Sequence, residues 1–564
     1  MCSLTNIKID CDSKSRVVLS YVWLVIIYIA AHILLCLVSG QWWDDWCYWL
    51  NGPEQLKVAY FESGMPLQAY FILSVMWLPN WGYRVVVFFL YLVTGLLFYS
   101  IVRNINLFSN EDAFYIAAVA MTVPVNDARI VLNCYGYSLE ITLFMIGFYI
   151  ATLIEKKNGL KHIILRVFSL LLLSLSYVME SLLVFTGLIW MYFFYLIWKR
   201  NRELKLIPKV IMMIKSHWDF LILPFAFYII KRSFFKPYGM YSGYNTFTID
   251  SLIIGTLVSP CSAFITFINI IMSYIKQLGL VSVIALCIVV VLYVILFQKK
   301  ETKYDKDTHD FRKNLIVLLL GGLVFYAGVY SYIIIRNGMP LANTGVAGRD
   351  SILAGFGIGF VVVAFLKLIP INCKLQNVIL IAIIVLGVFH FNDWYLNYQE
   401  DWYHQQELAI ALEQSDEIKQ ANTILCDFST YSPIDGTRFY SINGMSYLVT
   451  GKMDKFYYSG IEELHYGLTE QDFSECGFNC DDYDSSNNTI DCILYLNNSP
   501  IKNTELIKLR FYELFDHKEY ERMLGLITDY QYVKISEDNS NQIYYSYVNG
   551  ILTQETLHQI IGID

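Results

Sequence analysis

The sequence predicts a polytopic α-helical membrane protein of about 11 transmembrane helices, with a soluble α/β domain at its C-terminal end. Hydrophobic residues make up 56% of the 564 positions and charged residues only 16%, and many apolar runs are as long as a bilayer crossing requires. Residues 394–564 hold 10 Lys and Arg against 28 Asp and Glu, whereas residues 1–393 carry 31 against 21. This division predicts a basic membrane domain at 1–393 and an acidic, water-soluble domain at 394–564.

The first apolar run, 17–38, follows the basic residues Lys8, Lys14 and Arg16. No small-residue cleavage site of the kind that a signal peptide needs comes after this run. We therefore expect it to remain in the protein as the first transmembrane helix.

Three short loops between apolar runs are rich in Lys and Arg: 156–161, 199–209 and 299–313. The positive-inside rule places them on the cytoplasmic face together with the N-terminus. Because the number of predicted spans is odd, the acidic domain is expected outside. The spans are 17–38, 84–102, 112–125, 138–154, 163–179, 182–198, 218–232, 278–297, 314–335, 351–369 and 376–393.

The run 251–275 is also apolar enough to cross a bilayer, but a crossing there would move the basic loop 299–313 to the outer face. The run contains Ser259-Pro260, and proline removes a helix hydrogen bond. We therefore expect this segment to be re-entrant or to lie along the outer interface, as irregular backbone at membrane depth does when protein covers it.

The acidic domain shows helical and strand patterns in turn. Residues 402–420 have helical character, and further helices are predicted at about 504–526 and 553–561. Runs rich in β-branched and aromatic residues predict strands. These runs are 423–426, 437–442, 490–496, 530–535 and 543–548.

The most informative motif is Gln41-Trp42-Trp43-Asp44-Asp45-Trp46, which places two adjacent carboxylates directly after the first predicted helix. Tryptophans at a helix end are common interfacial anchors, so the acids could simply mark the exit into water. Alternatively, Asp44 or Asp45 is the proton acceptor of a membrane enzyme. The ionisable residues of the other outer loops favour the enzyme.

In the predicted outer loops, acids come early in the chain and bases come late. A cleft with a carboxylate on one wall and cations on the other suits transfer from an anionic lipid phosphate, because the carboxylate can take a proton and Arg can bind the departing phosphate. The candidate catalytic residues are Asp44, Asp45 and Glu180. The candidate residues for substrate or phosphate binding are Arg349, Arg129, Lys236, Glu62 and Glu140.

Plainer structural roles are open for the two arginines. Arg129 could form a salt bridge with Asp127, two residues earlier. Arg349 has Asp350 beside it, but it also opens a predicted helix, whose N-terminal dipole favours anions. Of the two, Arg349 is expected to be the better phosphate ligand.

Three other candidates have alternatives of the same kind. Glu180 lies in a very short link between apolar spans, where an acid is either functional or an interface carboxylate in water. Glu62 precedes Gly64-Met65-Pro66, and its role could be no more than to begin a turn. Lys236 could contact a lipid head group.

Motifs of soluble enzymes are absent from the sequence. It has no Walker A loop, no glycine-rich dinucleotide fingerprint and no His-Glu-x-x-His, and these absences disfavour a cytoplasmic nucleotide-sugar donor and zinc chemistry. The first loop has no Asp-x-Asp, so we expect no metal cofactor, although the sequence leaves a divalent ion open. The acidic domain has no basic patch that would bind nucleic acid.

The acidic pair after helix one, the many helices, the basic residue in a late outer loop and the external C-terminal domain together resemble the GT-C superfamily of polyprenyl-phosphate-sugar glycosyltransferases. The most similar members are bacterial enzymes that modify O-antigen or other surface polysaccharide, including serotype-converting glucosyltransferases. At the level of motifs the resemblance rests on Asp44-Asp45, with Arg84 and Gly348-Arg349-Asp350 as weaker support.

This resemblance implies inverting transfer of a sugar from a polyprenyl-phosphate donor to a glycan acceptor at the outer face of the membrane. Asp44 or Asp45 would act as general base, and the lipid phosphate would leave toward cationic side chains. By analogy, the external domain would recognise the acceptor or close over the active site. The bias toward Ile, Lys, Tyr and Asn favours a bacterial inner membrane.

Two other classes of function are open. A transporter or flippase for a lipid-linked glycan would carry buried acids in the middle of its spans and internal symmetry. A polysaccharide polymerase or ligase would concentrate its catalytic groups in one large late loop. A non-catalytic anchor for the acidic domain would not need eleven spans.

Overall fold

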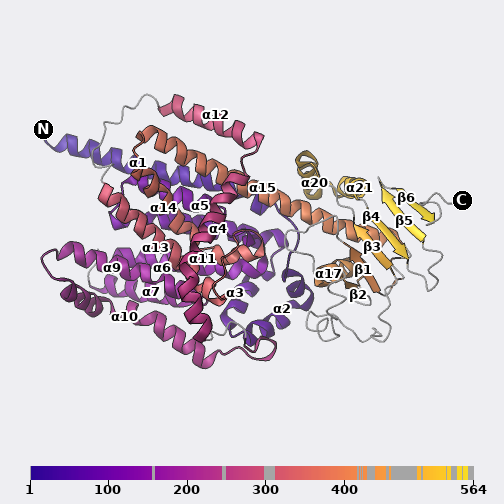
Figure 1. The fold of residues 1–564 in the computed structure, drawn as a ribbon, viewed down its shortest axis with the longest axis horizontal. Helices are drawn as coiled ribbons and strands as arrows, with labels where there is room; N and C mark the ends of the chain where they lie inside the picture. Colours follow the sequence, from indigo (N-terminus) through magenta and orange to yellow (C-terminus); the bar gives the residue numbers. More distant parts are fainter. Residues whose placement is uncertain are drawn as a thin grey trace. The chain divides into compact units, whose positions relative to one another are not determined.

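The structure of the chain is a computed structural model, and α-helices make up most of it (Figure 1). It describes residues 2–154, 159–243, 249–297, 311–415, 418, 421, 423–427, 439–451, 456–458, 492–496, 500–528, 530–534, 543–548 and 551–556. The chain forms two compact units. The membrane unit is 1–37 with 57–393, and the C-terminal unit is 38–56 with 394–564.

The boundary between the two units at Asp393 and Trp394 falls inside one long helix, α15 (Cys373–Gln414). The assignment of 38–56 to the C-terminal unit differs from the predicted organisation, in which residues 1–393 form one domain. This segment carries the Asp44-Asp45 motif, and it includes the first half of α2 (Asp45–Glu62). Hydrophobic side chains explain the difference, because Trp46 lies in the core of the C-terminal unit.

The described part of the membrane unit consists mainly of helices. The helix α2, whose bounds are given above, lies between α1 and α3. In chain order the other helices are α1 (Cys2–His32), α3 (Pro66–Met76), α4 (Asn80–Ile105), α5 (Asn110–Thr122), η2 (Asp127–Ile130), α6 (Tyr135–Ile154), α7 (Leu160–Ser176), α8 (Ser181–Phe185), α9 (Gly187–Arg200), α10 (Leu206–Phe234), α11 (Ile249–Lys276), α12 (Leu280–Phe297), α13 (Phe311–Ile335), η6 (Val346–Ser351) and α14 (Ala354–Leu368).

Within the described residues, eight helices are long and apolar enough to cross a membrane. Their spans are 15–36, 81–105, 132–154, 181–200, 206–234, 252–276, 311–335 and 373–413, and three shorter apolar helices lie at 66–76, 280–291 and 354–368. The chain is therefore a multi-pass helical membrane protein. Several predicted spans correspond to shorter helices, since α5 has 13 residues and α7 has 17.

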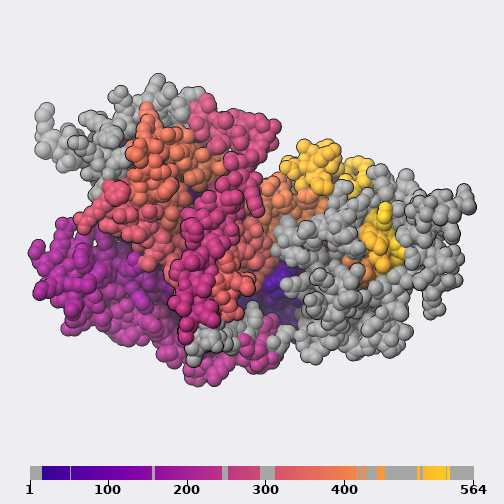
Figure 2. Space-filling view, in the orientation of Figure 1, coloured from indigo at the N-terminus to yellow at the C-terminus, as the bar shows by residue number. Residues whose placement is uncertain are grey.

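The prediction of an interrupted segment at 251–275 was wrong. α11 runs without a break through Pro260. Proline cannot donate to the carbonyl of Thr256, but the Ser259 hydroxyl donates to that oxygen at 2.8 Å and so satisfies it. In the space-filling view α11 is the magenta helix on the visible face (Figure 2), and its outward side chains include Leu257 and Phe264, as expected for contact with lipid.

Close backbone contacts hold α13 against α14 at the centre of the membrane unit. A Cβ on Gly357 would lie 2.2 Å from the Phe325 nitrogen, and a Cβ on Gly321 would lie 2.8 Å from the Val361 nitrogen. Only glycine fits at these positions. Small residues at helix interfaces are typical of membrane proteins, because they let dispersion forces act between closely packed backbones.

The C-terminal unit contains a six-stranded mixed sheet of order β2-β1-β3-β4-β5-β6. β2, β1 and β3 are parallel, and β4, β5 and β6 continue in antiparallel fashion. Its elements are β1 (Thr423–Asp427), α17 (Phe439–Thr450), β2 (Phe456–Tyr458), β3 (Cys492–Leu496), α20 (Asn503–Phe515), α21 (His517–Ile527), β4 (Tyr530–Lys534), β5 (Ile543–Val548) and β6 (Ile551–Thr556).

Four of the five predicted strands correspond to β1, β3, β4 and β5. The strand predicted at 437–442 was wrong, because α17 begins at Phe439. The helix predicted at 553–561 was also wrong where the structure describes it, since 551–556 form β6 opposite β5. The helix predicted at 504–526 is divided by Asp516, whose side chain accepts from the Glu519 amide and begins α21.

Candidate functional site

The segment between α5 and α6 carries a buried arginine. After α5 ends at Thr122, Asn126 takes a left-handed conformation with φ of 57°, which reverses the chain, and η2 follows. Asparagine tolerates this conformation better than most residues. The turn directs Arg129 inward, where only 6% of the residue is exposed.

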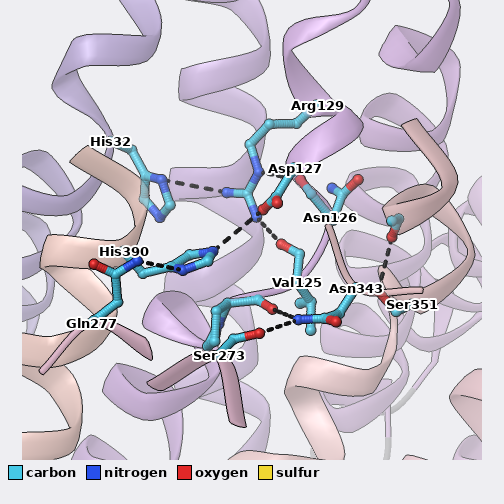
Figure 3. Close-up of polar contacts among 12 residues, drawn as sticks. His32, Val125, Asn126, Asp127, Arg129, Ser273, Gln277, Asn343, Ser351 and His390 are labelled. Carbon is cyan, nitrogen blue, oxygen red and sulfur yellow. Dashed lines mark hydrogen bonds and ion pairs between the residues drawn. The ribbon is translucent and has the colours of Figure 1, made fainter. Parts of the chain in front are cut away.

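Backbone carbonyls and a histidine hold the Arg129 guanidinium (Figure 3), and two aromatic rings lie against it. Nε donates to the carbonyl of Asn126 at 2.9 Å, and Nη2 donates to the carbonyl of Val125 at 3.0 Å. The carbon of the guanidinium lies 4.7 Å from the ring centroid of Tyr91 and 4.6 Å from that of Phe391. Such stacking suits the planar guanidinium group.

His32 completes the surroundings of Arg129 without adding negative charge. Its Nε2 lies 3.0 Å from the carbonyl oxygen of Met121, which can only accept, so Nε2 carries the proton. Its Nδ1 then accepts from Arg129 Nη1 at 3.4 Å. Arginine has five N–H donors. Three are used in these contacts, and the other two have no acceptor among the residues that the structure describes.

The alternative of a salt bridge between Arg129 and Asp127 does not hold among the described residues. In the described part of the chain, Arg129 forms no ion pair with a carboxylate. Asp127 is fully buried and turns to another element, with Oδ1 3.7 Å from Nε2 of His390 on α15. The second ring nitrogen of His390 lies 3.4 Å from Nε2 of Gln277. A buried cation without a counter-ion is costly, and this arrangement can therefore accept an anion.

A small cavity of about 40 Å³ opens beside Arg129 in the membrane unit. This volume is on the scale of one or a few water molecules. Asn126 lines the cavity, and its Oδ1 is buried and accepts no hydrogen bond from the described residues. The rest of the lining is mainly apolar and aromatic: Tyr28, Tyr91, Thr94, Gly95, Phe98, Ala120, Met121, Val125, Ile352, Gly355 and Phe356.

The second arginine site lies at η6 and has its own carboxylate. Arg336 Nε donates to Asp350 Oδ2 at 2.5 Å, and Arg349 Nε lies 3.8 Å from Asp350 Oδ1. Asp350 is buried, and burial raises the pKa of its carboxyl although Arg349 and Arg336 act in the opposite direction. The sequence favours Arg349 as the phosphate ligand. In the structure, however, Asp350 already shares the charge of Arg349. η2 contacts η6, so the two arginine sites are neighbours.

A third cluster of charged residues comes from α6, from the residue before α8 and from the last turn of α10. Lys231 Nζ lies 2.8 Å from Glu180 Oε1, and Arg232 Nη2 lies 3.8 Å from Glu180 Oε2. Glu180 is thus an ion-paired residue rather than a lone interface carboxylate. Glu140 on α6 is fully buried and close enough to Lys231 for electrostatic interaction.

Glu62 and Lys236 lie in two loops that touch. The amide of Tyr238 donates to the carbonyl of Glu62 at 2.8 Å, and a Cβ on Gly239 would lie within 2.8 Å of the Glu62 carboxylate oxygens. Glu62 ends α2, which agrees with the alternative that it begins a turn. Lys236 is exposed.

Asp44 and Asp45 belong to the C-terminal unit. Asp45 is 3% exposed and begins α2, and Asp44 is half-buried. The alternative that the surrounding tryptophans are interfacial anchors is wrong for two of them. Trp46 is fully buried in the core of this unit, and Trp42 donates to Asp401 Oδ2 at 2.7 Å.

Sequence reasoning missed His32, His390 and Asn126. The two histidines were available as signals, since each interrupts an otherwise apolar run near its predicted outer end. Among the residues that the structure describes, no group of three or more His, Cys, Asp or Glu is arranged to hold a metal ion.

Comparison with protein families, with curated proteins and with solved structures finds no match to this chain.

Proposed function

We propose that the chain is an inverting glycosyltransferase that moves a sugar from a polyprenyl-phosphate donor to a glycan or lipid-linked acceptor. The observation that carries the proposal is Arg129, a buried cation that no carboxylate neutralises in the described part of the chain. Two free N–H donors match a phosphate, which Arg binds through strong, often paired hydrogen bonds.

The surroundings of Arg129 favour a phosphate that carries a hydrocarbon chain over a free one. The adjoining cavity is lined mainly by apolar and aromatic side chains from α1, α4, α5 and α14, which all belong to the membrane unit. A polyprenyl phosphate combines an anionic head with an apolar tail. A water-soluble phosphate would gain nothing from this lining.

The reaction follows from these parts. The bond between the sugar carbon and the phosphate oxygen breaks, and the phosphate leaves as an anion that Arg129 stabilises. The acceptor oxygen forms the new bond to the same carbon, and its proton passes to a carboxylate. The resemblance to GT-C enzymes assigns this carboxylate to Asp44 or Asp45. It also assigns a late-loop cation to the phosphate, a role that Arg349 can fill only in part because Asp350 shares its charge.

The proposal includes a location. The basic loops face the cytoplasm, the N-terminus lies with them, and the C-terminal unit lies outside a bacterial inner membrane. About eleven crossings, the number expected from the sequence, would give this topology.

Transfer from a panel of radiolabelled polyprenyl-phosphate sugars by the purified full-length protein tests the proposal. Asp44→Asn and Asp45→Asn are compared with the wild type, and Glu203→Gln on an exposed loop is the matched control. Loss of a general base lowers the rate by about 10²–10⁴. If neither aspartate variant slows transfer, these carboxylates are not the base. If the wild type transfers no sugar, the enzyme proposal fails.

A transporter for a lipid-linked glycan is the second candidate, because Glu140 lies fully buried within the span 132–154. Buried acids at membrane depth often serve ion or substrate pathways. A transporter would move the lipid-linked glycan across vesicles without releasing free polyprenyl phosphate, whereas the transferase releases one for each sugar transferred.

A further inference from the structure

Helix α20 of the C-terminal unit has two apolar faces, and only one of them is buried. Leu506 and Leu509 pack in a hydrophobic core with Tyr403 and Leu524. The opposite face of the helix carries four exposed side chains, which we call the α20 stripe: Ile507, Phe511, Leu514 and Phe515, with 61%, 56%, 48% and 73% exposed. A helix that borders water normally presents polar residues on its outer face, so the α20 stripe indicates an interaction surface.

Hydrogen bonds hold α20 beside the two points where the chain leaves an apolar run. Arg510 Nη1 donates to Ser39 Oγ at 3.0 Å, and Ser39 lies three residues after the candidate span 15–36. The Tyr403 hydroxyl on α15 donates to Glu513 Oε2 at 3.0 Å. All of these bonds lie within the C-terminal unit. They fix α20 to the parts of this unit that continue directly into apolar runs.

The contacts with α15 and Ser39 indicate how far α20 lies from the hydrocarbon core of the bilayer. The apolar run of α15 is expected at 376–393, and Tyr403 comes ten residues later in the same helix. Ten helical residues are about 15 Å long, and the three residues that separate Ser39 from its span extend over at most about 11 Å. The head-group layer is about 5–8 Å thick on each side, and a helix with its side chains is about 10–12 Å across. A helix at the height of α20 therefore reaches the membrane surface.

The charge of residues 500–528, which contain α20 and α21, agrees with a lipid surface. These residues hold 5 Lys and Arg against 5 Asp and Glu, whereas the rest of 394–564 holds 5 against 23. Lys508 is exposed and adjoins the α20 stripe. Anionic head groups attract Lys and Arg and repel acids, so this is the part of the acidic domain that a bilayer repels least. A second copy of the chain would instead bring another strongly acidic domain.

We infer that α20 is an interfacial helix that binds the lipid bilayer. The side chains of the α20 stripe insert into the membrane surface near the end of the apolar run of α15, and Lys508 contacts anionic head groups. Amphipathic helices of this kind bury their apolar face about 5–10 Å into the boundary between head groups and acyl chains. In this way α20 holds the C-terminal unit on the membrane. The inference depends on the membrane-spanning helices and not on the proposed function.

Site-specific photo-crosslinking of the full chain tests this inference. The photoreactive residue p-benzoylphenylalanine replaces Phe511, and the protein is placed in nanodiscs of phosphatidylcholine and phosphatidylglycerol with radiolabelled acyl chains. The same probe at Leu448, an exposed residue of α17, is the matched control, because α17 packs in a different core through Ile442 and Met445. After irradiation, the probe at 511 should carry several-fold more labelled lipid than the probe at 448.

Further variants show whether the α20 stripe and its charge produce the crosslink. Leu514→Glu combined with Phe515→Glu should abolish lipid crosslinking from 511, while the midpoint of thermal unfolding stays close to that of the wild type because both side chains are exposed. Lys508→Gln should lower the yield of crosslinked lipid in nanodiscs that contain phosphatidylglycerol. It should leave the yield unchanged in phosphatidylcholine alone.

Three outcomes would overturn the inference. They are equal lipid yields at 511 and 448, a yield at 511 that survives the two glutamates, and crosslinking of 511 to a second copy of the chain in place of lipid. Sugar transfer is not measured in this experiment. Failure of the transferase proposal would therefore leave the inference intact, and failure of the inference would leave the transferase proposal intact.

Discussion

The membrane unit contains arginine sites on the neighbouring elements η2 and η6, and the two sites differ in what neutralises them. At η6, Asp350 lies between Arg336 and Arg349 and supplies a carboxylate to both. At η2, Arg129 meets two carbonyl oxygens, a neutral histidine and two rings. The first site is complete in the absence of a ligand.

The sequence favours Arg349 as the phosphate ligand, whereas this difference leads us to propose Arg129. Both Arg129 and Arg349 have an aspartate nearby in the chain, so sequence distance does not separate them. The fold separates them, because Asp127 turns to His390 whereas Asp350 stays with Arg349. The lesson is that a cation near an acid in sequence is available to a ligand only when the backbone directs the acid elsewhere.

Placing a carboxylate in the Arg129 cavity should make the two arginine sites alike. We expect this change to have the largest effect on sugar transfer. Asn126→Asp is isosteric, and the Tyr91 hydroxyl can still bond to residue 126 by donating. The new charge would compete with phosphate at a cost of several kcal/mol, so transfer should fall by about 100-fold or more. Initial rates against donor concentration measure the loss. Unchanged rates would show that phosphate does not approach Arg129.

Removing the carboxylate of the other site should cost stability rather than binding. Asp350→Asn leaves Arg336 and Arg349 without their shared partner, and because Arg336 is partly exposed we expect a loss of about 1–3 kcal/mol. Saturating polyprenyl phosphate should still stabilise this variant, by about 2.7 kcal/mol at 100 times its Kd. Denaturant unfolding with and without the lipid measures both quantities. A variant that keeps its stability but no longer responds to lipid would reverse the assignment of the two sites.

The pH dependence of stability should also distinguish the Asp350 site. Because burial raises the pKa of Asp350 in the folded protein, its contribution to stability is complete below the pKa of the unfolded chain and is lost as the pH rises through the folded value. The wild type should therefore lose some stability above about pH 4. Thermal unfolding from pH 4 to 8 should show a smaller loss in Asp350→Asn. Identical slopes would contradict the raised pKa.

The smallest effect is expected from Asn126→Gly, the matched control for Asn126→Asp. Glycine accepts the positive φ of this position, so the change removes the side-chain contact with Tyr91 and the cavity acceptor, worth about 0.5–1.5 kcal/mol. Transfer should fall only a few-fold. A loss as large as that of Asn126→Asp would show that the amide, rather than the charge balance, is what matters.

The sequence predicts the class of fold well because hydrophobic length and charge distribution determine it. Seven of the eight candidate spans among the described residues, and four of the predicted strands, follow from local pattern alone. The local pattern failed where a neighbour decided the outcome. Ser259 keeps α11 helical through Pro260, and pairing with β5 makes residues 551–556 a strand.

The site is less predictable than the fold, because its residues come from distant segments. His32 and Arg129 are 97 residues apart, and no periodicity links them. Trp46 is an example of a different kind, since its position after an apolar run predicts an interfacial residue. Contacts with residues more than 360 positions later place it instead in a hydrophobic core.

Binding of radiolabelled polyprenyl phosphate, without a sugar, tests the central claim most directly. It is measured on the purified wild type, on Arg129→Gln and on Arg336→Gln. Loss of two charge-assisted hydrogen bonds predicts that Arg129→Gln binds about 100-fold more weakly or worse, and Arg336→Gln should stay within about threefold of the wild type. Equal affinity of Arg129→Gln and the wild type, or a larger loss in Arg336→Gln, would contradict the account.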